Sequence, residues 1–183
     1  EEAGRLAQAA LEQMGRVDIL VNNAGTNKPQ AIDAITDQTW DEVLEINLSS
    51  VMALTRALVP QMKARRWGRI IHISSIMGFL SKEGRNVYSA TKSALLGLAR
   101  ASALDLGPHG ITVNCIAPGV TMTEATKKIV PEAFIDMLPA ISAMKRKLEP
   151  EDLAGTAVFF ASDDAALVTG QVLCVDGGSI MPA

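Results

Sequence analysis

The sequence predicts an α/β fold built on a parallel sheet. Short apolar runs at 17–21, 69–74, 111–116 and 171–175 have the length of buried strands, and helix-like segments separate them. Such alternation gives a parallel sheet with helices on its faces. The composition agrees, because 48% of the residues are hydrophobic and only 4% are aromatic. A chain of 183 residues is expected to form one domain over 1–183.

The first segments follow this pattern. Apolar side chains recur at helical spacing over 2–15, and Gly15 ends the predicted helix. The strand at 17–21 stops where Asn22 begins an Asn-Asn-Ala-Gly turn, and a single helical turn is expected at 33–36.

A long helix is predicted over 39–65. Asp37 or Thr39 would cap its start. Pro60 lies inside it and is expected to kink or divide the helix, because proline lacks the backbone N–H.

The second half alternates in the same way. A helix with small residues along it is predicted over 86–106, and Gly107-Pro108-His109-Gly110 ends it. Residues 124–147 contain two prolines and are expected to be irregular. A helix over 150–161 begins with proline and two acidic residues, which suit a first turn.

Composition also excludes several classes of function. A net charge of −3 offers no basic surface for nucleic acid. No signal peptide is recognised, and no run of about 18 apolar residues predicts a membrane span. His72 and His109 lack the spacing of metal ligands, so no metal site is expected. Cys115 and Cys174 are expected to be buried free thiols, which indicates a reducing, cytoplasmic location.

Three residues have the spacing needed for proton transfer. Tyr88 and Lys92 are four residues apart in a predicted helix and therefore share one face. Ser75 follows the strand at 69–74, and α/β proteins place their chemistry at such strand ends. A nearby ammonium lowers the pKa of a phenol. A Tyr and a Lys at this spacing are, taken alone, more often surface residues of an amphipathic helix.

These residues and their flanking motifs resemble the classical short-chain dehydrogenase/reductase family. The matching pieces occur in the family's order: Asn22-Asn23-Ala24-Gly25, Asn47, Ser75, Tyr88-Ser-Ala-Thr-Lys92, Pro118-Gly119 with Thr123, and Val175-Asp176-Gly177-Gly178. The resemblance implies a Rossmann-like, doubly wound parallel sheet, of which this sequence supplies about four of seven strands as the C-terminal part. The family's opening T-G-x-x-x-G-x-G segment has no counterpart before Asn22, and the sequence is expected to lack it.

The resemblance assigns catalytic roles to four residues. Tyr88 is the general acid/base, and Ser75 holds the substrate oxygen. Lys92 lowers the pKa of Tyr88 and binds the nicotinamide ribose. Asn47 breaks its helix locally and holds a water that links Lys92 to solvent. The alternative for Asn47 is an exposed polar residue with no further role.

The resemblance also implies NAD or NADP as the cofactor, without deciding between them. The expected cofactor-binding residues are Asn23, Ala24, Gly25, Tyr88, Lys92, Pro118, Gly119, Thr121 and Thr123. Residues 124–147 would form a substrate lid. Four apolar lid residues would line the pocket or serve only in packing, namely Phe134, Met137, Leu138 and Met144.

The implied activity is the interconversion of a secondary alcohol and a ketone. The stretch 75–86 is most similar to sugar-acid or polyol dehydrogenases, such as gluconate 5-dehydrogenases, with 3-oxoacyl-carrier-protein reductases as the alternative. Arg85 is either a contact for a substrate carboxylate or a plain surface residue.

A homotetramer or homodimer is expected through the helices at 39–65 and 86–106. A truncated, cofactor-deficient, non-catalytic oligomerising module is an alternative of another class.

Overall fold

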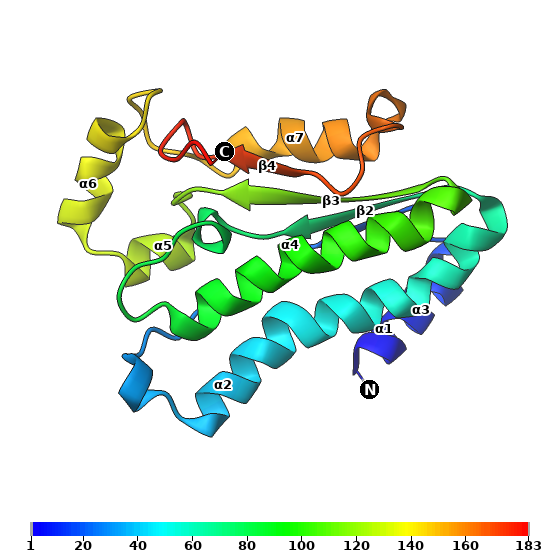
Figure 1. The fold of residues 1–183 in the computed structure, drawn as a ribbon, viewed down its shortest axis with the longest axis horizontal. Coiled ribbons are helices and arrows are strands. Elements are labelled where there is room, and N and C mark those ends of the chain that lie inside the picture. The colour runs from blue at the N-terminus through cyan, green and yellow to red at the C-terminus, as the bar shows by residue number, and fades with distance from the viewer. Residues whose placement is uncertain (1, 183) are drawn as a thin grey trace.

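A four-stranded parallel sheet lies between two layers of helices in the computed structural model, which describes residues 2–182 (Figure 1). The strands are β1 (Ile19–Asn22), β2 (Gly68–Ile73), β3 (Ile111–Pro118) and β4 (Val172–Val175), side by side in that order. All three pairings are parallel, which confirms the predicted α/β class. The helices are α1 (Glu2–Met14), α2 (Asp37–Leu44), α3 (Ser50–Arg65), α4 (Asn86–Leu106), α5 (Glu124–Ile129), α6 (Glu132–Ile141) and α7 (Glu151–Ala161).

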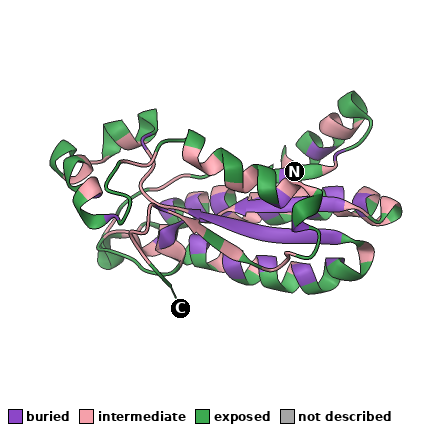
Figure 2. Cartoon of the chain, turned by 90° about the horizontal axis from the view of Figure 1, so that it is seen from above, coloured by how far each residue is buried: buried purple, intermediate pink, exposed green. Residues whose placement is uncertain are grey.

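Two apolar clusters hold the layers together, one on each face of the sheet. Successive strand residues point to opposite faces. Ile70 therefore packs with α1, α3 and α4, whereas Ile71 packs with Phe160 of α7. Figure 2 shows central strands that are almost entirely buried, which are β2 and β3, and outer helix faces that are exposed. Leucine-sized side chains buried in this way each contribute about 1.5–3 kcal/mol to folding.

The strand register brings the loops that follow β1, β2 and β3 together at the carboxyl ends of these strands. Asn22 pairs with His72, and Ile73 pairs with Ile116, so β1, β2 and β3 end close together. The segments that follow these strands carry most of the predicted site residues. Sheet pairing, rather than proximity along the chain, thus gathers them.

The long helix differs from prediction at its start and in its middle. Thr36 caps it, because its side chain accepts a hydrogen bond from the N–H of Thr39. Asp37 and Thr39, the expected caps, lie inside α2 instead. The helix runs through Pro60 without dividing there, because Pro60 lies on the exposed side of α3. The irregularity is a π-helical turn, η2 (Glu45–Ser49), between α2 and α3.

The helical stretch Asp37–Arg65 is long and apolar enough, by length and composition alone, to cross a membrane. In the structure, however, its inner side chains are buried: Leu58 and Met62 belong to the cluster that also contains Ala7 of α1. Core helices of folded domains have the same composition.

Two other expectations are corrected. Residues 124–147 are not irregular, because α5 and α6 form there on either side of Pro131. The strand β1 is not buried on both sides: Leu20 faces the core, whereas Ile19 and Val21 are 43% and 46% exposed. Helix α7 contacts β2, β3 and β4, whereas Ile19 and Val21 leave that face of β1 exposed.

Replacement of Gly110 by alanine should destabilise the fold. Gly110 ends the turn after α4 with φ +70°, and a Cβ there would lie 2.5 Å from the carbonyl oxygen of Arg66. Gly110→Ala is expected to lower the free energy of unfolding by more than about 1 kcal/mol, measured by urea denaturation. The control, Gly4→Ala, adds a methyl group in open space on α1 and should leave stability unchanged or slightly raised. Equal stability losses in the two variants would contradict this account.

Candidate active site

A cavity of about 750 Å³ opens at the carboxyl ends of β1, β2 and β3. Ser75, Tyr88 and Lys92 all line it, as do segments of α5, α6 and α7. Ligand sites of parallel α/β sheets occupy this position. A second hollow, of about 510 Å³, lies over α2 and η2 and is lined mainly by acidic residues.

The two adjacent serines at the end of β2 have different environments. The Ser74 hydroxyl donates a hydrogen bond of 2.8 Å to the carbonyl oxygen of Lys92, which fixes it against α4. Ser75 has extended backbone and caps the short helical turn η3 (Ile76–Gly78), where its Oγ accepts from the N–H of Met77 at 3.1 Å. The Ser75 O–H thus remains available as a donor to a bound molecule, whereas the Ser74 O–H is already used.

Tyr88 and Lys92 lie on one face of α4, as their spacing predicts. The Lys92 ammonium is 5.6 Å from the centroid of the Tyr88 ring. The lysine side chain is almost completely buried, and its Nζ donates a hydrogen bond of 2.8 Å to the carbonyl oxygen of Ile73. That oxygen belongs to the last residue of β2, so the helix and the strand end fix the ammonium together.

Burial dominates the pKa values of both groups. It lowers the pKa of Lys92 to about 8, because the charged ammonium loses hydration. Burial raises the pKa of Tyr88, whereas the Ser75 hydroxyl and the positive charge of Arg85 act in the opposite direction. The sequence-based expectation of a Tyr88 pKa lowered by Lys92 is therefore wrong for this structure, since desolvation of the phenolate is the larger effect.

Asn47 is buried in the π-helical turn and has all its polar atoms bonded. Its Oδ1 accepts from the N–H of Thr26 at 2.7 Å. Its Nδ2 donates to the carbonyl oxygen of Thr26 at 2.9 Å and to the hydroxyl of Thr91 at 3.1 Å. The prediction of a local helix break is confirmed, and the alternative of an exposed residue is wrong. Asn47 joins the loop after β1 to α4 and does not line the cavity.

Gly25 lies where these groups meet. A Cβ at Gly25 would be 3.4 Å from Nζ of Lys92 and 3.6 Å from Oδ1 of Asn47. The sequence marked Gly25 as part of a turn and, through the family resemblance, as a cofactor-binding residue. Its close approach to both side chains depends on the pairing of β1 with β2 and could not be read locally.

Most of the predicted cofactor-binding residues surround the same cavity. Asn23, Gly25, Tyr88, Lys92, Pro118, Gly119, Thr121 and Thr123 line it. Ala24 does not line the cavity, although it is exposed.

Two residues of the loop after β3 also have structural roles that the sequence did not reveal. Thr123 caps α5, because its Oγ1 accepts from the N–H of Thr126 at 3.1 Å. A Cβ at Gly119 would lie 2.8 Å from Cβ of Asp176, so only glycine fits beside the turn after β4. The carboxylate of Asp176 closes that turn by accepting from the N–H groups of Gly178 and Ile180.

The segment 124–147, the expected lid, contributes different residues to the cavity from those expected. Of the four apolar candidates only Phe134 lines the cavity. Leu138 is buried, whereas Met137 and Met144 are 46% and 65% exposed. Four further residues of this segment line the cavity and were not expected to, namely Ala125, Thr126, Ile129 and Val130. Their apolar stripe could have been read from a helix prediction over this segment, which its prolines argued against.

Within residues 2–182, no three His, Cys, Asp or Glu side chains gather as metal ligands would. His72 is buried in β2 and hydrogen bonded through Nδ1 to Asn22 at 3.0 Å, and burial lowers its pKa to about 4. Cys115 is a buried free thiol as expected, but Cys174 is only partly buried.

Comparison with known proteins places this chain among reductases and dehydrogenases. Residues 1–179 match the family described as Enoyl-(Acyl carrier protein) reductase. The chain is 38% identical over 181 residues to the 3-oxoacyl-(acyl-carrier-protein) reductase FabG of Staphylococcus epidermidis, covering 99% of this chain and 74% of that protein. It is 36% identical over 181 residues to the Homo sapiens dehydrogenase/reductase SDR family member 4, covering 98% and 65%.

A solved structure agrees with these sequence relatives. The gluconate 5-dehydrogenase from Burkholderia cenocepacia J2315, in complex with NADP and tartrate, is 33% identical to this chain with a TM-score of 0.92. The match covers 97% of this chain and 70% of that one.

The buried Lys92 should give stability a defined pH dependence. Its pKa is about 8 in the folded chain and 10.5 when exposed, so between these values the unfolded chain binds more protons. Stability contributed by this group therefore rises with pH across that window, by roughly 3 kcal/mol in total. The unfolding free energy of the wild type minus that of Lys92→Met should increase from pH 8 to pH 10.5. Parallel curves for the two proteins would contradict a buried, partly deprotonated lysine.

Proposed function

The chain belongs to the short-chain dehydrogenase/reductase family of NAD(P)-dependent oxidoreductases, and we propose that Ser75, Tyr88 and Lys92 carry out its interconversion of a secondary alcohol and a ketone. One observation carries this proposal: a phenol, a buried ammonium and a serine hydroxyl line one wall of one cavity. This arrangement favours catalysis over the alternative of a non-catalytic oligomerising module.

The residues around the cavity fit the nicotinamide and ribose end of NAD or NADP. Lys92 and the Asn23 amide offer hydrogen-bond donors for ribose hydroxyls. Thr121 and Thr123 offer hydroxyls near the end of β3 for a carboxamide. Gly25 leaves space beside the Lys92 ammonium because it has no Cβ. The bound cofactor supplies or accepts the hydride.

The proton chemistry belongs to this chain's own side chains. During reduction, the Ser75 hydroxyl donates a hydrogen bond to the substrate carbonyl oxygen and stabilises the charge that develops there. The Tyr88 O–H transfers its proton to that oxygen, and the Ser75 hydroxyl and the Arg85 charge favour the phenolate that remains. Oxidation of the alcohol reverses these transfers. A Lys92 pKa of about 8 lets the ammonium exchange protons near neutral pH.

Asn47 acts in this scheme as a positioning residue. It ties the Thr26 backbone to Thr91 on α4, and the Thr91 hydroxyl in turn donates to the carbonyl oxygen of Tyr88 at 2.8 Å. Asn47 therefore sets the distance between the loop after β1 and the helix that carries Tyr88 and Lys92. A water held nearby would extend this contact to Lys92.

A sugar acid or polyol is the proposed substrate class, with 3-oxoacyl thioesters as the alternative. The relatives named above include both a gluconate 5-dehydrogenase and a 3-oxoacyl-(acyl-carrier-protein) reductase. Residues 124–147 are proposed as the substrate lid, because α5 and α6 bring Ile129, Val130 and Phe134 to the cavity. We place the protein in the cytoplasm.

We further propose a homotetramer or homodimer that pairs α3 and α4 with their symmetry mates. Gly97, Ala101 and Leu104 are exposed at helical spacing on the outer face of α4, and Leu104 is 80% exposed. Small residues let two helices approach closely, and an exposed leucine beside them favours burial in an assembly.

Tyr88→Phe should abolish most of the activity without unfolding the protein. The change removes only the phenolic O–H that transfers the proton. Turnover in NADP(H)-linked ketone reduction or alcohol oxidation is expected to fall by about 10²–10⁴-fold. Far-ultraviolet circular dichroism and the unfolding temperature should match the wild type. A variant with nearly full turnover would show that another group transfers the proton.

Ala101→Glu should dissociate the assembly. Ala101 is exposed on α4, and glutamate suits a helix, so the folded protomer should tolerate the change. In a helix-pairing interface the same carboxylate would be buried without a partner. Light scattering is expected to report a smaller particle, whereas Ala101→Ser should keep the wild-type mass. An unchanged mass for Ala101→Glu would exclude this surface as the interface.

A further inference from the structure

The wall of the active-site cavity carries a marked imbalance of charge. Three cationic side chains line it, Lys82, Arg85 and Lys92, whereas no Asp or Glu appears among the described residues that form the wall. The chain as a whole has a net charge of −3. The proton chemistry uses Lys92 and leaves the other two cations without a role.

Lys82 and Arg85 lie in the loop that joins the Ser75 strand end to α4. Arg85 is half-buried at the N-cap of α4, one helical turn before Tyr88. Within residues 2–182, neither side chain has an ion pair or a side-chain hydrogen bond. Eight other arginine or lysine side chains of that range do pair with a carboxylate, namely Arg5, Arg16, Lys28, Arg65, Arg69, Lys127, Arg146 and Lys147.

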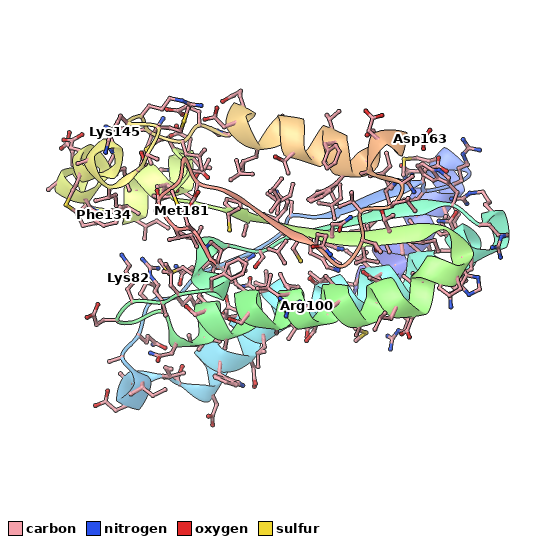
Figure 3. The ribbon with its side chains drawn as sticks, turned by 45° about the horizontal axis from the view of Figure 1, so that its top comes forward. Lys82, Arg100, Phe134, Lys145, Asp163 and Met181 are labelled. Carbon is pink, nitrogen blue, oxygen red and sulfur yellow. The ribbon has the colours of Figure 1, made fainter. Side chains whose placement is uncertain are left out.

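Lys82 also reaches the lid. Its Nζ lies 4.9 Å from the centroid of the Phe134 ring, which belongs to α6. Figure 3 shows Lys82 and Phe134 at the same end of the molecule, on elements that approach from opposite sides. A cation over an aromatic face remains free to pair with an anion on its other side.

The start of α4 adds to the positive potential. The helix is 21 residues long, its first turn holds no acidic residue, and no side chain caps it. The positive end of the helix dipole therefore lies beside Arg85. The one carboxylate of this loop, Glu83, is exposed and does not line the cavity. Two unpaired cations and a helix N-terminus thus act on the same part of the cavity.

We propose that Lys82 and Arg85 bind a carboxylate of the substrate and make the enzyme selective for hydroxy or keto acids. This inference rests on the proposed function and narrows its substrate class. Arg85 would pair with the carboxylate in two parallel hydrogen bonds, while Lys82 contributes charge from the lid side. The substrate's reacting carbon would then lie between this anchor and the Ser75 and Tyr88 hydroxyls.

The position of Arg85 favours a small acid over an acyl thioester. The Arg85 charge is close enough to Tyr88 to act on its pKa. The carboxylate of a sugar acid lies a few bonds from the carbon that is oxidised. The phosphate of an acyl-carrier thioester is separated from its keto group by the whole pantetheine arm, and would lie outside this part of the cavity.

A matched pair of substrates tests the proposal. D-gluconate and D-gluconamide differ in the charge of one group, and each is assayed for NADP⁺- and NAD⁺-dependent oxidation. The variants are Lys82→Gln, Arg85→Gln and the charge-conserving Arg85→Lys. The control is Lys128→Gln, which removes an exposed lid charge that does not line the cavity.

Loss of a charge-assisted hydrogen bond predicts that Arg85→Gln lowers kcat/KM for gluconate by at least about tenfold, mainly through KM. Lys82→Gln should act in the same direction, and Arg85→Lys should recover part of the loss. Kinetics with gluconamide and the KM for NADP⁺ should stay close to those of the wild type. Lys128→Gln should change none of these values.

Three other results would overturn the inference. Equal losses for gluconate and gluconamide would make these residues structural, and a raised KM for NADP⁺ would assign them to the cofactor. A loss confined to acetoacetyl-coenzyme A, with acetoacetyl-N-acetylcysteamine unaffected, would assign them to a phosphate. With any of these three results, turnover of the compounds by the wild type would still support the proposed function. If the wild type turns over none of these compounds, the proposed function fails, and this inference fails with it.

Discussion

The buried ammonium of Lys92 is the constraint around which the rest of the site is arranged. Desolvating a charge of this kind is costly unless partners are provided. The structure provides the carbonyl oxygen of Ile73 and the face of the Tyr88 ring. The same burial that brings the pKa of Lys92 to about 8 makes it useful for proton exchange. Burial of Lys92 therefore costs folding stability and at the same time shifts its pKa toward neutral pH, a combination that is common at functional sites.

The π-helical turn gives Asn47 its position. A regular helix over 37–65 would have placed this amide differently relative to α4, whereas the turn lets it bond to both Thr26 and Thr91. Such turns are rare and occur often at functional sites. The helix is weakened locally, and in return the loop after β1 is fixed against the helix that carries Tyr88 and Lys92.

The proposed function assigns specificity and chemistry to different parts of the chain. In it, the reacting groups come from strand ends and α4, which are held by sheet pairing and core packing. The loop with Lys82 and Arg85, together with α5 and α6, closes the cavity and is more exposed. Under this proposal, the loop and the segment 124–147 can change with the substrate while the residues assigned to proton transfer stay in place. It accounts for the similarity of this chain to enzymes whose names give different substrates.

Local sequence patterns determined most of the secondary structure and the relative placement of two site residues. Apolar runs and helical spacing predicted four parallel strands, the full extent of α4, and Tyr88 and Lys92 on one face of it. Tertiary structure alone decided the burial of Asn47, whose partners are 21 and 44 residues away. It also decided which lid residues reach the cavity, and that desolvation of Tyr88 outweighs its neighbouring charges. The reason is physical: periodicity records which face of an element is apolar, whereas burial and pKa depend on what packs against that face.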